Sequence, residues 1–114
     1  GSSAECARIA TCKSVVGANT YAAMKTATST NGKILVWAAG KYGGAHPYAE
    51  AKSVLYDTAL QGLSVAVVAI NATNADGSGA KDGKIWSSSN RCGDAAAYCI
   101  AAPGADITYV ANAA

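Results

Sequence analysis

Two uninterrupted apolar runs dominate the pattern of the chain, KILVWAA at residues 33–39 and LSVAVVAI at residues 63–70. Each has the length of a strand, and neither alternates apolar and polar residues as a half-exposed strand does. Runs of this kind are typical of parallel strands whose two faces are both covered. We therefore predict two buried strands of a parallel sheet.

A helix is predicted immediately before the first run. The segment YAAMKTATST at residues 21–30 follows Asn19 or Thr20, either of which can serve as an N-cap, and it ends at Asn31-Gly32, a typical helix stop. A helix, a glycine turn and a buried strand in succession form half of an α/β crossover unit. Further helices are expected over residues 4–15 and, as a short one, over residues 48–55.

The second half of the chain predicts further strands. Residues 71–84 form a turn-rich loop, IWSSSN at residues 85–90 reads as a short alternating strand, and residues 98–110 contain another strand, interrupted by Pro103-Gly104. The fold class is therefore α/β, with four short, mainly parallel strands and one or two helices.

Composition narrows the function classes. The 114 residues suffice for one domain. Alanine makes up about a quarter of them and phenylalanine is absent, so the core is expected to be built from small side chains. Only 14% of the residues are charged and the basic ones are scattered, which argues against nucleic-acid binding. No apolar run approaches the roughly 18 residues of a membrane helix, so membrane insertion is not expected.

The four cysteines form two local pairs, Cys6 with Cys12 and Cys92 with Cys99. Their spacing is not that of a zinc knuckle, and His46 is the single histidine. Two short disulfide loops are the simplest account and would place the protein in an oxidising compartment. Four reduced cysteines buried in the core are the alternative.

Neither a catalytic histidine nor a metal or cofactor site can be assembled from the sequence. His46 lies in a glycine-flanked loop and no G-x-S-x-G elbow occurs, so we expect a solvated side chain. In the loop from Asn71 to Asp82, placing Asp76-Gly77 fifth and sixth in a calcium loop puts Ala72 first and Gly83 twelfth, where a bidentate glutamate is required. No cofactor is expected.

Small residues close two of the predicted strands, in WAAGKYGG and in IAAPG. They allow another backbone to approach closely, as a bound peptide does. The carboxyl ends of parallel strands are also where α/β folds place ligands. The pattern therefore indicates a substrate cleft, although tight packing of helices on the sheet would use the same residues.

At these residues the chain resembles a subtilisin-like serine protease domain, and most of all the subtilases carried by bacterial autotransporters. The helix, GKILVWAAG, LSVAVVAI and IWSSSNRCGDAAAYCIAAPGADI follow one another in the family's order. The C-x6-C spacing in the last block is similar to the disulfide of the autotransporter branch. The resemblance covers residues 19–107, whereas residues 1–18, with the first cysteine pair, remain unassigned within the single domain 1–114.

The resemblance implies that Ala38, Ala39 and Gly40 line the pocket for the substrate side chain. The next position in the family is an asparagine that donates a hydrogen bond to the oxyanion, and here it is Lys41. The family's aspartate, histidine and GTS serine motifs do not occur in the 114 residues, and His46 does not match the catalytic histidine.

Two functional hypotheses follow. In the first, the chain is a fragment of a secreted or surface serine peptidase of bacterial type, inactive without a complementary protease segment. In the second, it is a self-standing secreted structural or binding module that forms homo-oligomers through open sheet edges.

Overall fold

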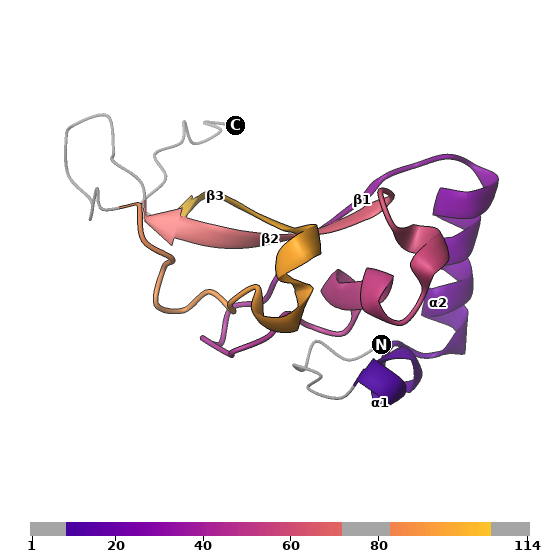
Figure 1. The fold of residues 1–114 in the computed structure, drawn as a ribbon, viewed down its shortest axis with the longest axis horizontal. Helices are drawn as coiled ribbons and strands as arrows, with labels where there is room; N and C mark the ends of the chain where they lie inside the picture. The colour runs from indigo at the N-terminus through magenta and orange to yellow at the C-terminus, as the bar shows by residue number, and fades with distance from the viewer. Residues whose placement is uncertain (1–8, 72–82, 106–114) are drawn as a thin grey trace, which may run out of the picture.

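The computed structural model describes residues 9–71 and 83–105, and for residues 9 and 10 it describes the backbone alone. The fold is α/β, as predicted: a parallel three-stranded sheet in the order β1-β2-β3, with helices packed beside it (Figure 1). The α-helices and strands are α1 (Ile9–Val16), α2 (Ala18–Lys25), β1 (Leu35–Ala38), β2 (Ser64–Asn71) and β3 (Cys99–Ala105).

Both apolar runs form strands of this sheet. β1 and β2 pair in parallel, with Leu35 opposite Ser64 and Ala38 opposite Val67. β2 then pairs in parallel with β3 from Ala66, with a register shift near the end of β2. The first two predicted strands are therefore confirmed, with slightly different bounds.

Two predictions for the second half of the chain are wrong. Residues 85–90 do not form a strand, because only Ile85 makes a bridge, antiparallel to Ile70, and the backbone then turns. The described residues thus contain three strands and not four. Pro103-Gly104 does not end β3 either: the strand continues to Ala105, and the irregularity is limited to a register shift that skips Gly104 in the pairing with β2.

The helix predicted over residues 21–30 is confirmed and begins slightly earlier. α2 starts after Gly17, which provides no side-chain cap, and continues into a π-helical turn at Thr26–Thr30. There Thr28 donates its hydroxyl to the Met24 carbonyl over 2.8 Å, a contact that competes with regular helical bonding. Gly32 ends the segment at a φ of 66°. Three 3₁₀ segments complete the fold: η2 (Glu50–Leu55), η3 (Thr58–Leu60) and η4 (Gly93–Tyr98).

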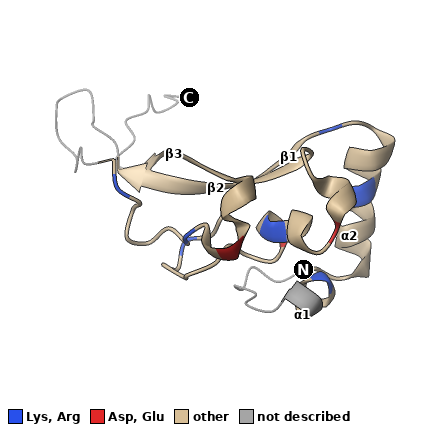
Figure 2. Ribbon diagram, viewed as in Figure 1, with Lys and Arg blue, Asp and Glu red and all other residues tan. Residues whose placement is uncertain are grey.

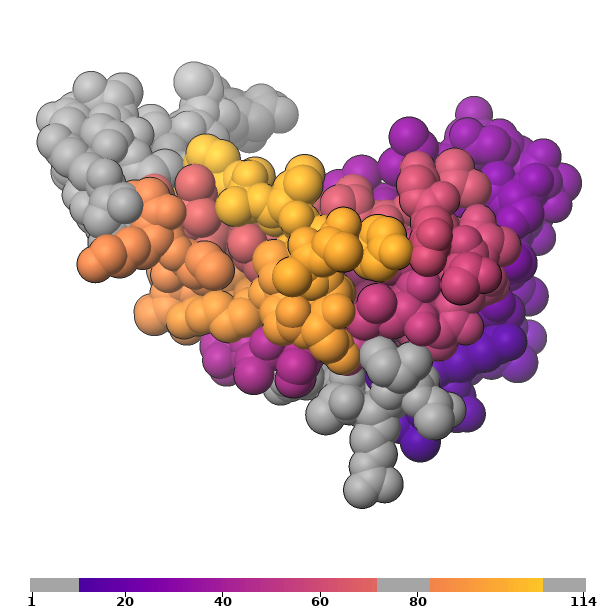
Figure 3. All heavy atoms as spheres, viewed as in Figure 1, coloured from indigo at the N-terminus to yellow at the C-terminus, as the bar shows by residue number. Residues whose placement is uncertain are grey.

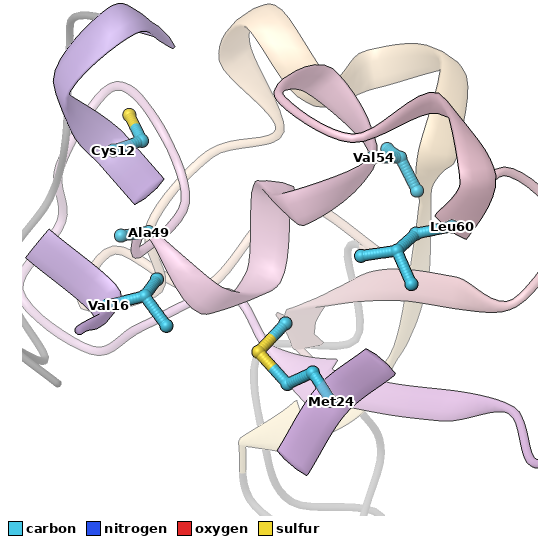
Figure 4. Close-up of a cluster of buried hydrophobic side chains, with 6 residues drawn as sticks. All are labelled: Cys12, Val16, Met24, Ala49, Val54 and Leu60. Carbon is cyan, nitrogen blue, oxygen red and sulfur yellow. The ribbon is translucent and has the colours of Figure 1, made fainter. Parts of the chain in front are cut away.

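The segments η2 and η4 pack directly on one face of the sheet, below it in the view of Figure 1, while α2 stands beside the β1 end of the sheet. On that face Leu35 and Trp37 of β1 pack against a core cluster contributed by the helices and the segments between them. Figure 4 shows its buried members: Cys12, Val16, Met24, Ala49, Val54 and Leu60.

The opposite face of the sheet, which we call the bare face, is not covered by any described helix. Val36 alternates with Leu35 and Trp37 and is 66% exposed, and Ile100 of β3 is 55% exposed. The strands carry no charged residue (Figure 2). The prediction of burial on both faces is therefore wrong for β1, whereas no residue of β2 is exposed.

A network of four side chains fastens α2 to the turn before η3. Tyr21 donates its hydroxyl to Asp57, and the ammonium of Lys25 lies 3.0 Å from the same carboxylate. Burial alone would raise the pKa of Asp57, but the hydrogen bonds from Tyr21, Lys25 and a backbone N–H lower it below its usual value. The bond to Asp57 raises the pKa of Tyr21 to about 12. Burial raises the pKa of Tyr56, whose ring centroid lies 6.4 Å from that of Tyr21.

Within the described residues, no helix combines the length and the apolar character needed to cross a membrane.

Candidate functional site

A pocket of about 320 Å³ opens where β1 and β2 end. Ala38, Ala39, Gly40 and Lys41 all contribute to its lining, so the structure brings the four residues singled out from the sequence to one site. Its remaining walls come from β2 and from the segments that follow β1 and precede η4: Val67, Ala69, Tyr42, Tyr48, Trp86 and Ser89. The walls are almost wholly apolar or aromatic.

Gly40 gives the chain its sharp exit from β1. Its φ of 125° is a conformation that residues with side chains rarely adopt. A Cβ at this position would lie 2.6 Å from Nδ2 of Asn90 and 2.7 Å from Cε1 of Tyr48. The absence of a side chain therefore allows the Asn90 amide and the Tyr48 ring to pack directly against the backbone.

Asn90, which the sequence did not single out, fixes the loop that follows Gly40. It is only 1% exposed, and its Oδ1 accepts the N–H of Tyr42 over 3.1 Å and that of Gly44 over 3.0 Å. Its Nδ2 donates to the carbonyl of His46, and its backbone N–H donates to that of Gly40. One buried side chain thus replaces the hydrogen bonds that a regular element would give this loop.

Three aromatic residues surround the pocket. The rings of Tyr42 and Tyr48 have centroids 6.2 Å apart and are tilted by 45°, and Tyr42 is 76% exposed. The backbone N–H of Trp86 donates to the Ala69 carbonyl over 2.8 Å, which holds the indole beside β2. These aromatic groups are suited to an apolar or aromatic ligand.

The polar groups of the pocket differ in whether they are already bonded. The hydroxyl of Ser89 accepts the N–H of Ala69 over 3.0 Å and donates to the Asn90 carbonyl over 2.9 Å. Lys41 is exposed, is the one charged residue among those lining the pocket, and pairs with no described carboxylate. The hydroxyl of Tyr48 lies 3.5 Å from the backbone N–H of Lys41, a long contact.

His46 is not simply solvated, contrary to the expectation from the sequence. Its Nδ1 lies 3.2 Å from Oδ1 of Asp94 and 3.1 Å from the backbone N of Asp94. The other carboxylate oxygen of Asp94 lies 2.7 Å from the ammonium of Lys52, whose side chain is fully buried. Asp94 therefore ties the His46 loop and η2 to η4, which is a structural role.

The second predicted disulfide is confirmed. Cys92 and Cys99 are bonded, with a Cα–Cα distance of 5.9 Å, and they close the loop that contains η4. Cys12 is also in a disulfide, while its predicted partner Cys6 lies outside the described residues. The alternative of reduced cysteines is therefore wrong for these three, and the disulfide is compatible with an oxidising compartment.

The second small-residue strand end serves packing. A Cβ on Gly104 would lie 2.5 Å from that of Ala69, so glycine there allows β3 to approach β2 closely. Pro103 and Gly104 line a groove of about 280 Å³ on the bare face instead of the pocket. No group of three potential metal ligands occurs among the described residues, and most of the calcium-like loop lies outside them.

Comparison with known proteins does not place the chain in a family. The chain matches no family model, no curated protein and no solved structure.

Proposed function

We propose that the chain is the side-chain-binding part of a subtilisin-like serine peptidase domain, secreted or surface-exposed and of the bacterial autotransporter type. The observation that carries the proposal is the pocket at the carboxyl ends of β1 and β2, with Ala38, Ala39 and Gly40 in its wall. Its place agrees with the general position of ligands in parallel α/β sheets. Its residues are those to which the resemblance assigns the substrate side chain.

The chemistry available to the chain is binding and not hydrolysis. The pocket is large enough for an aromatic or branched aliphatic side chain, and its walls offer apolar contact. None of the three triad motifs occurs in the sequence. Lys41 stands at the oxyanion position, and its long flexible stem is a poor substitute for a fixed neutral amide donor.

The bare face supports a complementary protease segment as the missing partner. Parallel sheets normally carry helices on both faces, whereas the described helices cover only one. Val36 and Ile100 expose large apolar side chains on the other face. A segment that covers them would complete the sheet, and in this proposal it also brings the catalytic groups.

The side-chain specificity of the pocket can be tested by titrating the ¹⁵N-labelled chain with N-acetyl-phenylalaninamide and N-acetyl-alaninamide. We expect the phenylalanine compound to shift the amide signals of Gly40 and Tyr42, and the alanine compound to have little effect. Ala38→Leu should abolish the shifts, because it fills the pocket. Ala101→Leu is the matched control, since Ala101 is an exposed strand residue outside the pocket. Equal responses to both compounds would refute side-chain binding at this site.

The absence of catalysis has its own test. A serine-directed fluorophosphonate probe should leave the folded chain unlabelled, because no activated serine is expected. Stoichiometric labelling of a single serine would overturn this part of the proposal.

A self-assembling structural module is the second candidate function, and exposed apolar residues on both edge strands favour it. Ile34 and Val36 lie at or before β1, Ile100 lies on β3, and Figure 3 shows β3 in yellow at the molecular surface. Unpaired strand edges of this kind tend to pair with other chains. Light scattering after size exclusion tests it: a dimer or larger species supports the module, and a monomer at all concentrations excludes it.

A further inference from the structure

The charge arrangement of the pocket indicates a ligand with two different parts. We propose that it binds an apolar side chain joined to a free carboxylate, with Lys41 pairing with the carboxylate at the mouth. A peptide whose last residue is aromatic and a small arylalkyl carboxylic acid both have this chemistry. The inference rests on the proposed function, since it requires that the pocket take an apolar side chain, and it adds the charged group beside that side chain.

The mouth of the pocket offers one cation and, among the described lining residues, no competing anion. Lys41 lines the pocket, is exposed and pairs with no described carboxylate, whereas Lys25 and Lys52 each lie within 3.0 Å of an aspartate oxygen. A lysine ammonium is protonated at neutral pH. It can therefore pair with an anionic ligand without first giving up a protein partner.

Most polar groups near Lys41 already have hydrogen-bond partners within the protein. The Ser89 hydroxyl already has two backbone partners, and Asn90 uses both ends of its amide to hold the loop. The hydroxyl of Tyr48 receives only the long contact from the Lys41 backbone, and its own proton has no acceptor in the described part of the chain. The groups available to a ligand are thus a cation and an O–H donor, which together match a carboxylate.

The size and charge of the pocket favour a singly charged ligand. One lysine and one phenol are enough for a singly charged carboxylate, while phosphate sites commonly combine several cationic or backbone donors. In a pocket of about 320 Å³ the apolar part of the ligand can be an aromatic ring. The carboxylate must then lie only a few bonds from the ring, as it does in a C-terminal aromatic residue.

The test compares an acid with its uncharged amide, and adds an arylalkyl acid that has no peptide group. We would titrate the full oxidised chain at low salt with N-acetyl-phenylalanine, N-acetyl-phenylalaninamide and 3-phenylpropionate, following amide shifts. Ligands of this size should bind with a Kd on the order of a millimolar. The acid should bind about three- to fivefold more tightly than the amide, the range of an exposed ion pair, and the preference should shrink as salt is added.

Variants assign the preference to Lys41. Lys41→Met should bind the acid and the amide equally, whereas Lys33→Met, which removes an exposed charge outside the pocket, should keep the preference. Tight binding of N-acetyl-phenylalanine with weak binding of 3-phenylpropionate would identify a peptide C-terminus as the source. Comparable binding of the two would identify a free acid, and either result supports the inference.

Three outcomes would overturn it, and they are distinguishable. Equal binding of acid and amide in the natural chain would refute the carboxylate while leaving the side-chain pocket intact. A preference for the acid that survives in Lys41→Met would remove Lys41 from the site. No binding of any of the three compounds would refute both this inference and the proposed function.

Discussion

Replacing Gly40 by alanine tests whether the pocket wall is as rigid as the structure indicates. The new Cβ would lie 2.6 Å from the Asn90 amide nitrogen and 2.7 Å from the Tyr48 ring, well inside van der Waals contact. Asn90 cannot move aside without breaking the hydrogen bonds that it makes to Tyr42 and Gly44. The substitution therefore combines backbone strain at a positive φ with overpacking.

The magnitude follows from separating these two effects. A non-glycine residue in a strained conformation costs about 1–3 kcal/mol, and overpacking a well-filled site adds about 1–3 kcal/mol. Gly40→Ala should therefore cost roughly 3–5 kcal/mol in the free energy of unfolding. Gly62 has a φ of 80° and no atom within 4 Å of its added Cβ, so Gly62→Ala should show strain alone, about 1–2 kcal/mol.

Thermal unfolding of the oxidised chains, followed by circular dichroism, distinguishes the two variants. At roughly 4 °C per kcal/mol for a domain of this size, the Tm should fall by about 12–20 °C in Gly40→Ala and by about 4–8 °C in Gly62→Ala. Equal losses would show that Asn90 and Tyr48 yield to the added methyl group. In that case the argument that they form a fixed pocket wall would be wrong.

Three further predictions concern the stability of the fold. Asp94→Ala should lower the free energy of unfolding in urea by about 2 kcal/mol, because it removes a carboxylate that pairs with the buried ammonium of Lys52. Lys52→Met should change that free energy by less than about 1 kcal/mol. Equal losses in the two variants would contradict this account of the pair. The double variant Cys92→Ser, Cys99→Ser should lose about 2.5 kcal/mol in the free energy of unfolding, the chain-entropy value for so short a loop. No loss would show that this disulfide does not stabilise the fold. Because the pKa of Asp57 is lowered in the folded state, its carboxylate stabilises the fold above about pH 4, and this stabilisation is lost as the pH falls through the folded-state pKa. Asp57→Asn should therefore be less stable at pH 7, and its stability should change less between neutral and acid pH. A stability–pH profile that is the same in both chains would exclude this linkage.

The strands were predictable because their apolar runs are long and uninterrupted. β1 and β2 formed where expected, and so did the helix ended by Gly32. The burial of both sheet faces was not predictable, because an apolar run shows that both faces are suited to burial and not which segment covers each. Val36 is the example: it belongs to the apolar run, but its side chain is exposed.

The failure at residues 85–90 has a different cause. Ile85 and Trp86 have the alternation and residue types of a strand, and their backbones lie against the end of β2. The Ser89 and Asn90 side chains then bond to backbone groups of β2 and of the loop after Gly40, where a strand would make backbone ladder bonds. Local periodicity contains no information on such long-range hydrogen bonds. The backbone therefore turns after Trp86, where the sequence pattern predicts that it continues.

The pocket could be predicted only in part. Ala38, Ala39, Gly40 and Lys41 are consecutive, so a local pattern of small residues at a strand end was enough to locate them. Trp86 and Asn90 reach the same place from a segment far along the chain, and no pattern within their own segment indicates that they would.

The most direct test of the central claim is where a bound aromatic side chain lies. Intermolecular NOEs should be measured between the ring of N-acetyl-phenylalaninamide and the side chains of the protein. The account predicts NOEs to the rings of Tyr48 and Trp86, which line the pocket and not the groove on the bare face. NOEs mainly to Ile100 and Val36 on the bare face, or none at a saturating concentration, would contradict it.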